Sequence, residues 1–268
     1  MVITVKILQL LPLLLLLSCI DLMIQDVKYN SLYFTGGSWI EFAEIDSMKL
    51  ESNDFTIQFW VSGGEVDTNE APAMFSIIDP NNNTTLAIFR DVNQKNSITT
   101  IINSAIDKQE YSGLDWSDSD KFYLFSFNFS DTKGLNIYIN DYKILSSGSL
   151  LDVKGSTLNV GAKANKDRTI LENFWYGYID EIRLWNTILT DSTIKFQSEH
   201  PDKLGDNYRY TDGNGNEIST YLDSLIGIWR LNFEDPLTII EDDSEHDNDG
   251  NIYTLSGFSV ELSEKGVK

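Results

Sequence analysis

The stretch FYLFSFNF at Phe122–Phe129 decides the fold of this chain. Phe125, Phe127 and Phe129 fall on one side of it, because alternate residues of a β-strand face the same way. A polar turn at 130–134 follows, and LNIYI at 135–139 returns with the same period of two. We therefore expect an antiparallel hairpin whose apolar face turns toward a core.

Short apolar runs of the same kind recur along the chain between clusters of Asn, Asp, Gly and Ser. The run 55–61 places Phe55, Ile57, Phe59 and Val61 on one face and Trp60 on the other. Such spacing of short strands and turn residues is typical of an all-β sandwich. The only clear helical signal is one short helix near 191–198, preceded by the capping residue Thr190.

The strand expected at 174–185 has a mixed pattern. Tyr178, Asp180, Ile182 and Leu184 would share one face of a regular strand, although they do not suit one environment. We therefore expect this strand to be buried in part, with a polar group facing inward near Asp180.

The N-terminus has the layout of a secretory signal. One lysine at position 6 precedes an apolar run at 8–17, and Ser18 and Cys19 follow. The run is shorter than the roughly 20 residues of a membrane-spanning helix. A cysteine after a small residue at this place resembles the lipobox of bacterial lipoproteins. That resemblance implies cleavage before Cys19 and a lipid on Cys19; the alternative is an ordinary apolar residue within a leader.

The composition excludes some classes of partner. The formal net charge is −21, with 41 acidic and 20 basic residues. Such a chain repels nucleic-acid phosphates, so we expect no nucleic-acid partner. Acidity favours solubility and can favour divalent cations, but a solvated acidic surface is the plainer explanation. Because Cys19 is the single cysteine, no disulfide can form within the chain.

Four motifs, in this order, resemble the laminin-G-like, concanavalin-A-like jelly-roll superfamily, and especially its bacterial extracellular members. They are SLYFTGG–WIEF at 31–42, DFTIQFWV at 54–61, LNIYIND at 135–141 and GYIDEIRLWN at 177–186. The third has Asp141 where glycine is usual. The resemblance implies a concanavalin-A-like jelly-roll sandwich of two antiparallel sheets.

These features divide the chain into five parts. We expect a signal peptide at 1–18, a lipidated tether at 19–29, the jelly roll at 30–199 and a loop or linker at 200–224. The strands at 225–268 either complete the sandwich or are the truncated start of a second copy. The first is favoured, because exposing Ile228, Trp229, Leu231 and Phe233 would forgo roughly 1.5–3 kcal/mol of burial for each side chain.

The resemblance also implies a structural calcium ion. In the family, an aspartate at the place of Asp180 often ligates calcium together with carbonyls of the opening hairpin, here near Gly36 and Gly37. The alternative is that Asp180 bonds to Arg183 or to a backbone amide. The stretch 212–216 resembles half of an EF-hand loop, but Glu217 replaces its required glycine.

The acidic loop near the C-terminus offers a second candidate cation site. Asp243, Asp247 and Asp249 could gather a cation there, although a solvated acidic loop is the plainer explanation.

The same fold includes laminarinase- and lichenase-type glycosidases, which place two glutamates around an aspartate on one strand. Glu44-Ile45-Asp46 looks like the start of that motif, but Met48 and Lys49 stand where the second glutamate belongs. His200 and His246 lie in polar loops without the spacing of a metal site or a catalytic triad. We therefore expect a protein that is not an enzyme.

The function that follows is a lipid-anchored, non-catalytic module of the bacterial cell envelope, in the outer membrane or at the cell surface, which recognises carbohydrate or mediates adhesion. Trp116, in the polar setting of Asp115, Ser117 and Asp118, is the candidate for stacking on sugar rings; it could instead be a half-buried loop anchor. The expected partners are carbohydrate or a surface protein, with the membrane reached through the lipid. Two alternatives stay open: a structural or protein-interaction domain without a glycan ligand, and a divergent glycoside hydrolase.

Overall fold

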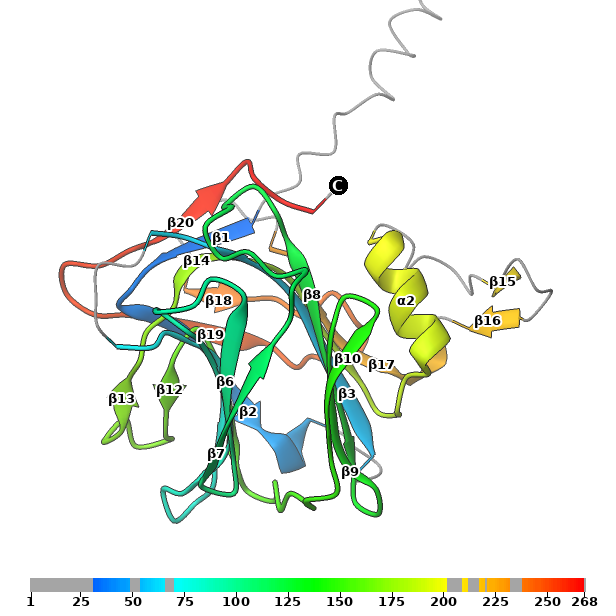
Figure 1. The fold of residues 1–268 in the computed structure, drawn as a ribbon. Helices are drawn as coiled ribbons and strands as arrows, with labels where there is room; N and C mark the ends of the chain where they lie inside the picture. Colours follow the sequence, from blue (N-terminus) through cyan, green and yellow to red (C-terminus); the bar gives the residue numbers. More distant parts are fainter. Residues whose placement is uncertain are drawn as a thin grey trace, which may run out of the picture.

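The computed structural model describes residues 31–48, 54–65, 70–201, 209–211, 217–219, 221–231 and 238–267. Cys19 and the rest of the leader lie outside these residues. Two eight-stranded antiparallel sheets pack face to face (Figure 1), so the prediction of an all-β, jelly-roll-like sandwich is confirmed.

The first sheet contains the hairpin that the alternating pattern of residues 122–139 predicts. Its strands, in spatial order, are β10 (Tyr142–Ser147), β9 (Gly134–Ile139), β8 (Tyr123–Ser130), β3 (Phe55–Gly63), β14 (Tyr176–Trp185), β1 (Ser31–Thr35) and β20 (Val260–Ser263), with β17 (Leu225–Trp229) also paired to β14.

The second sheet closes the other side of the core. Its strands are β18 (Ile239–Ile240), β19 (Gly250–Thr254), β2 (Ser38–Glu44), β11 (Thr157–Val160), β4 (Ala73–Ile78), β5 (Thr84–Arg90), β6 (Ser97–Ile102) and β7 (Ala105–Glu110). Short pieces complete the described chain: β12 (Lys163–Ala164) with β13 (Leu171–Glu172), β15 (Arg209–Thr211) with β16 (Glu217–Ser219), the 3-10 helices η1 (Ile45–Ser47) and η2 (Leu222–Ser224), and the helix α2 (Asp191–Glu199).

The hairpin of β8 and β9 has the predicted faces. Phe125 pairs with Ile139 and Phe127 with Ile137, and all four side chains lie in the main core. The ring of Phe127 stacks on that of Phe75 of the opposite sheet, with ring centroids 5.1 Å apart. The sandwich is therefore joined at its centre by aromatic rings from both sheets.

A β-bulge explains the mixed pattern of β14. Asp180 pairs with Trp60 and Arg183 with Gln58, so β14 has one more residue than β3 across this interval. Glu181 carries the irregularity, at φ +34°. The bulge shifts the alternation by one residue, so that Tyr178 and Asp180 lie on the outer face while Ile182 and Leu184 lie in the core.

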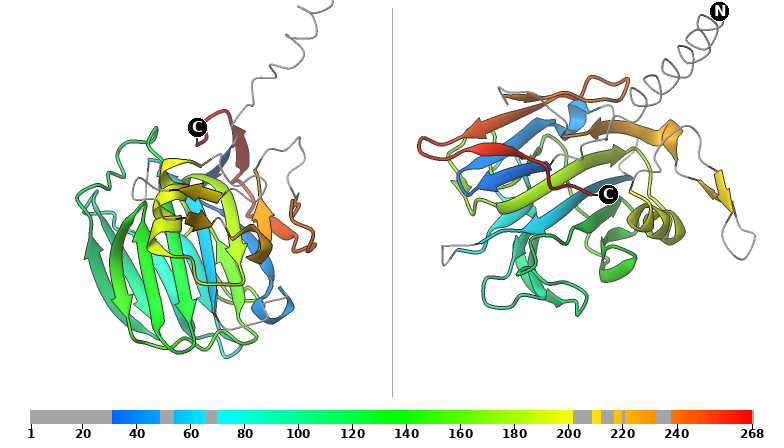
Figure 2. Two further views of the ribbon diagram at one scale, coloured as in Figure 1. Left: turned by 90° about the vertical axis from the view of Figure 1, so that its right-hand side faces the viewer. Right: turned by 90° about the horizontal axis from the view of Figure 1, so that it is seen from above.

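Part of the outer face of the first sheet is covered by α2 (Figures 1 and 2). The helix begins where Oγ1 of Thr190 accepts the backbone N–H of Thr193, which is the predicted cap. Ile194 packs with Trp185 and Tyr138 in a second apolar cluster. Gln58 and Trp60 of β3, on the same outer face of the sheet, are also buried.

The C-terminal strands extend both sheets. β17 pairs with β14 and β20 with β1 in the first sheet, whereas β19 pairs with β2 in the second. The segment 200–224, expected to be a loop, contains the short hairpin of β15 and β16, which lies out beyond α2 in Figure 1. None of the helices described is long and apolar enough to cross a membrane.

Candidate functional site

A pocket of about 450 Å³ lies at one end of the sandwich, where β3 and β5 end. We call it the rim pocket. Its volume falls in the roughly 300–1,000 Å³ range of small-molecule sites. It is lined by Tyr33, Gly63, Gly64, Glu65, Arg90, Trp116, Ser117, Ser119 and Tyr178.

Two tyrosine rings form one wall of the rim pocket. Tyr33 and Tyr178 are register partners across β1 and β14, and their ring centroids are 4.7 Å apart at an interplanar angle of 43°. Because Leu32 and Ile179 point into the core, the two tyrosines on the alternate positions point outward. Both are half-buried. The wall therefore presents aromatic surface with hydroxyl groups at its edge.

Glycine backbone forms the floor. The N–H of Gly64 donates to the carbonyl of Tyr176 at 3.1 Å, and Gly177 adopts φ +137°. A Cβ on Gly63 would lie 2.5 Å from the Trp116 carbonyl oxygen, and one on Gly177 would lie 2.3 Å from the Ser62 carbonyl oxygen. A Cβ at either position would collide with protein backbone, so both positions require glycine, and Gly63 and Gly64 line the pocket with main chain alone.

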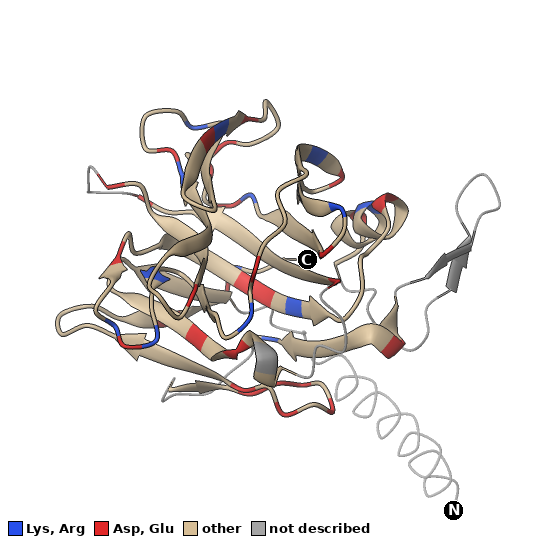
Figure 3. Cartoon of the chain, turned by 90° about the horizontal axis from the view of Figure 1, so that it is seen from below, with Lys and Arg blue, Asp and Glu red and all other residues tan. Residues whose placement is uncertain are grey.

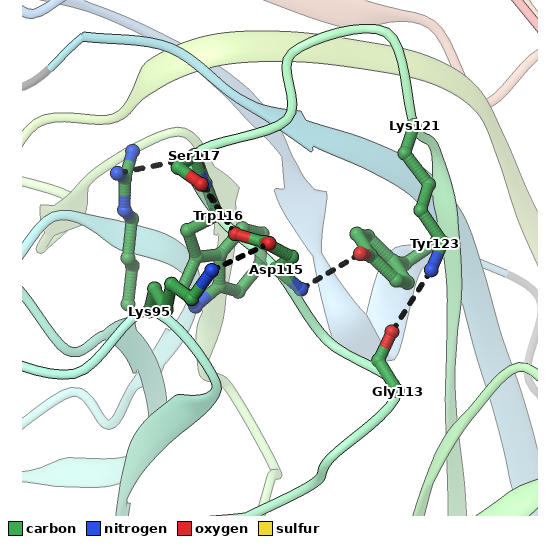
Figure 4. Close-up of polar contacts among 8 residues, drawn as sticks. Lys95, Gly113, Asp115, Trp116, Ser117, Lys121 and Tyr123 are labelled. Atoms are coloured by element: carbon green, nitrogen blue, oxygen red, sulfur yellow. Dashed lines mark hydrogen bonds and ion pairs between the residues drawn. The ribbon is translucent and has the colours of Figure 1, made fainter.

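The opposite wall is a loop that Asp115 holds rigid (Figure 4). Oδ1 of Asp115 accepts the N–H of Ser117 at 3.0 Å and its hydroxyl at 2.5 Å, while Oδ2 accepts from Lys95 at 2.9 Å. The backbone N–H of Asp115 donates to the hydroxyl of Tyr123. The hydrogen bond from Lys95, with those from Ser117, holds the pKa of the Asp115 carboxyl well below its usual range. These hydrogen bonds tie the loop to Lys95 and to Tyr123 of β8.

Arg90 joins the floor to this loop. Its Nη1 donates to the Gly64 carbonyl at 2.6 Å and its Nη2 to the Trp116 carbonyl at 3.3 Å. Burial lowers the pKa of the Arg90 guanidinium from its ordinary value. The side chain therefore acts as a cross-link between the ends of β3, β5 and the loop.

A family model described as the concanavalin A-like lectin/glucanases superfamily matches residues 34–195, which is more than half of the chain. The chain belongs to this superfamily. The resemblance found in its strand motifs is confirmed on this point. No curated protein matches the sequence.

Two solved structures are similar to this chain in fold. The heptameric SAP-like pentraxin from Limulus polyphemus is 13% identical, with TM-score 0.51, over 89% of this chain and 97% of that one. A putative carbohydrate-binding protein from Bacteroides ovatus is 12% identical, with TM-score 0.53, over 87% of this chain and 59% of that one. Identities this low show the fold alone, and this chain spans little more than half of the second protein.

Trp116 is not the exposed platform that its sequence neighbours indicate. The side chain is 1% exposed, and Nε1 donates to the Ser97 carbonyl at 3.0 Å. Its ring stacks on Phe125 and meets Trp175 edge-on. Trp116 is therefore buried as an anchor of the loop, which is the alternative that the sequence left open, and its role in sugar binding stays a prediction.

Asp180 is buried, at 8% exposed, and its Oδ2 accepts the backbone N–H of Val267 at 2.9 Å. Burial raises the pKa of the Asp180 carboxyl to about 7. Because Thr35 pairs with Tyr176, the turn at Gly36 lies at least about 13 Å along β14 from Asp180. The carbonyls expected from that turn therefore do not fit a calcium site at Asp180, and calcium binding there stays a prediction.

Glu44, Asp243 and Asp249, three of the other acidic candidates, already have partners within the protein. Lys166 pairs with Glu44, which ends β2, and Arg230 pairs with Asp243. Asp249 accepts the backbone N–H of Asp242. Acidic residues lie on loops around the molecule (Figure 3), and among the described residues no three His, Cys, Asp or Glu side chains gather as a metal site. Residues 212–216 lie outside the described chain.

Sequence reasoning missed the residues that form the rim pocket. Tyr33, Tyr178, Arg90 and the pair Gly63–Gly64 were not among the predicted site residues. One signal in the sequence could have indicated the two tyrosines. Tyr33 and Tyr178 each alternate with residues that face the core, which is the pattern of side chains that point outward. Their contact depends on the register between β1 and β14.

Proposed function

We propose that this protein is a non-catalytic carbohydrate-binding module, lipid-anchored at the bacterial cell envelope, and that the rim pocket is its sugar site. The observation that carries the proposal is the outward-facing pair of Tyr33 and Tyr178 above a floor of glycine backbone. Aromatic faces stack on the C–H faces of sugar rings, while bare backbone and hydroxyl groups bond to sugar hydroxyls. The superfamily, which contains lectins, is consistent with this assignment.

The side chains near the incomplete glycosidase motif support a binding role over catalysis. A retaining glycosidase needs two free carboxyl groups about 5–5.5 Å apart. On β2, Glu41 pairs with Arg168 and Glu44 with Lys166. Each of these carboxylates is already paired with a basic side chain, so neither is one of the two free groups that such catalysis needs.

Binding is tested with the full chain, solubilised in a mild detergent, on a broad polysaccharide array with calcium present. We expect selective binding that falls at least about tenfold in the variant Tyr178→Ala, because the stacking face is lost. The control is Tyr142→Ala, since Tyr142 is an exposed tyrosine on β10 that stacks on Tyr111 and does not line the pocket. No binding across the array would refute the sugar site and favour a protein-interaction role, which a pull-down from the envelope would then test.

The lipid anchor is tested separately. In a bacterial host that lipidates such cysteines, the native chain should partition into the detergent phase and gain the mass of a diacylglycerol-linked lipid. The variant Cys19→Ser should do neither, because serine lacks the thiol that carries the lipid. Detergent partitioning without an added lipid mass would contradict the proposal.

A further inference from the structure

Lys265 lies between the two walls of the rim pocket, although it is far from both in the sequence. Its Nζ is 2.6 Å from Oδ1 of Asp120 and 3.2 Å from Oγ of Ser119, on the loop wall. The same Nζ lies 5.1 Å from the centre of the Tyr178 ring, on the tyrosine wall. One ammonium group therefore contacts both sides of the pocket.

The backbone around Lys265 is held in place independently of its side chain. β20 pairs with β1, with Glu261 opposite Tyr33. Beyond that strand, the Ser31 hydroxyl donates to the Lys265 carbonyl at 2.6 Å, and Val267 bonds to Asp180. The position from which the lysine extends is therefore fixed by contacts outside the pocket.

The loop residue that Lys265 contacts is fixed in the same way. The Ser62 hydroxyl donates to the Ser119 carbonyl at 2.9 Å, which holds the backbone of Ser119 against β3. Lys265 therefore acts on the Ser119 side chain rather than on the position of its backbone.

The chemistry of this contact sets the direction of a hydrogen bond. An ammonium group only donates, so Oγ of Ser119 must accept from Lys265. The hydroxyl proton of Ser119 is then left to donate elsewhere, and Ser119 lines the pocket. The nearby positive charge also makes that hydroxyl a stronger donor.

Resting on the proposed function, we propose that Lys265 is a specificity-determining residue, which orients Ser119 so that its hydroxyl donates to an acceptor oxygen of the bound sugar. Lys265 is a positioning residue in this scheme, because it acts through Ser119. The Tyr178 ring, beneath the lysine, keeps the ammonium group in place.

The test is a double-mutant cycle on the glycan found with the array, with the full chain in detergent. Lys265→Met keeps the apolar stem over Tyr178 but removes the donor, and Ser119→Ala removes the hydroxyl. We expect each single variant to weaken binding about threefold to tenfold, as for the loss of one hydrogen bond. The double variant should be no weaker than the worse single variant, because both changes remove the same bond. Lys265→Arg, which is still a donor, should restore most of the affinity.

Two controls separate this inference from its alternatives. Lys166→Met removes another exposed lysine with a carboxylate partner, Glu44, and should leave binding unchanged. A purely structural role for Lys265 would instead give losses that add in the double variant and a lower melting temperature. Additive losses, or full affinity in Lys265→Met while Tyr178→Ala abolishes binding, would overturn the role of Lys265 and leave the sugar site intact. Absence of binding in the native chain would instead refute the proposed function.

Discussion

The backbone N–H of Val267 donates to Oδ2 of Asp180 at 2.9 Å, and so the last described residue of the chain is bonded to a carboxyl group buried within β14. This bond does not offset the desolvation of the carboxyl, because burial still raises its pKa to about 7. The folded protein therefore holds a proton on Asp180 at pH values where the unfolded chain has released it.

The first prediction is a stability that depends on pH through Asp180. The folded-state pKa lies above the ordinary value of 3.8, so the folded state binds more protons than the unfolded state between about pH 4 and 7. The contribution of Asp180 to the free energy of unfolding should therefore fall across this window, by on the order of 4 kcal/mol in total, and stay constant above it. Asp180→Asn has no titrating group and can still accept the Val267 amide.

Chemical unfolding of both proteins from pH 4 to 8, in buffer with a chelator, measures this effect. The stability of Asp180→Asn relative to the native protein should rise with pH through the window. A difference that is flat with pH would show that the Asp180 carboxyl titrates at its ordinary value in the folded protein.

The second prediction concerns metal removal. Against the calcium ion that the sequence resemblance implies, we expect EDTA to leave the melting temperature unchanged, because the turn at Gly36 lies at least about 13 Å along β14 from Asp180 and Val267 already bonds to Asp180. Differential scanning calorimetry with EDTA, and then with excess calcium, makes the comparison. A melting temperature that falls with EDTA, recovers with calcium and is insensitive to both in Asp180→Asn would establish a calcium ion at Asp180 with other ligands.

The third prediction tests the close packing of Gly177 against the backbone of Gly63 and Gly64, which line the rim pocket. Gly177→Ala should destabilise the protein by about 2–4 kcal/mol, because the new methyl group would meet the Ser62 carbonyl in a backbone conformation that already disfavours side chains. Gly257→Ala is the matched control. It also has a positive φ, +92°, but nothing lies within 4 Å of its Cβ, so only the strain of about 1 kcal/mol should appear. If urea unfolding gives the same loss in free energy of unfolding for Gly177→Ala and Gly257→Ala, close packing at Gly177 does not contribute to stability.

The fourth prediction tests Trp116 as an anchor. Trp116→Ala should cost about 3–5 kcal/mol of stability, because it empties a fully buried site between Phe125 and Trp175. Phe258→Ala removes an aromatic ring that is 44% exposed and should cost less than about 1 kcal/mol. Thermal unfolding distinguishes the two. A stable Trp116→Ala protein that loses only sugar binding would restore Trp116 as a ligand-contacting residue.

The strands could be predicted from the sequence where the alternating apolar residues are also the ones buried in the core. The alternation in 122–129 and 135–139 was enough to place Phe125, Phe127, Ile137 and Ile139 on the core face. The outward face of β3 was assigned correctly too, but its burial was not predictable. What covers Gln58 and Trp60 comes from distant parts of the chain.

The site depends on contacts that local patterns do not contain. Trp116 has polar neighbours in the sequence, whereas the rings that bury it lie in β8 and just before β14. The bulge at Glu181 decides which residues of β14 face outward; the mixed residue pattern indicated an irregular strand there but did not place the bulge. The tyrosine wall exists only because the register of β1 against β14 places Tyr33 beside Tyr178.

If Cys19 carries the proposed lipid, the start of β1 at Ser31 sets how far the domain could extend from a membrane. Ser31 follows the proposed tether, and Tyr33 of the sugar site lies only two residues further on. With a lipid on Cys19, the residues 19–30 span at most about 40 Å even when fully extended. A pocket this close to its tether would bind glycans within a thin layer above the lipid head groups. The surface density of the glycan, rather than its concentration in bulk solution, would then govern binding.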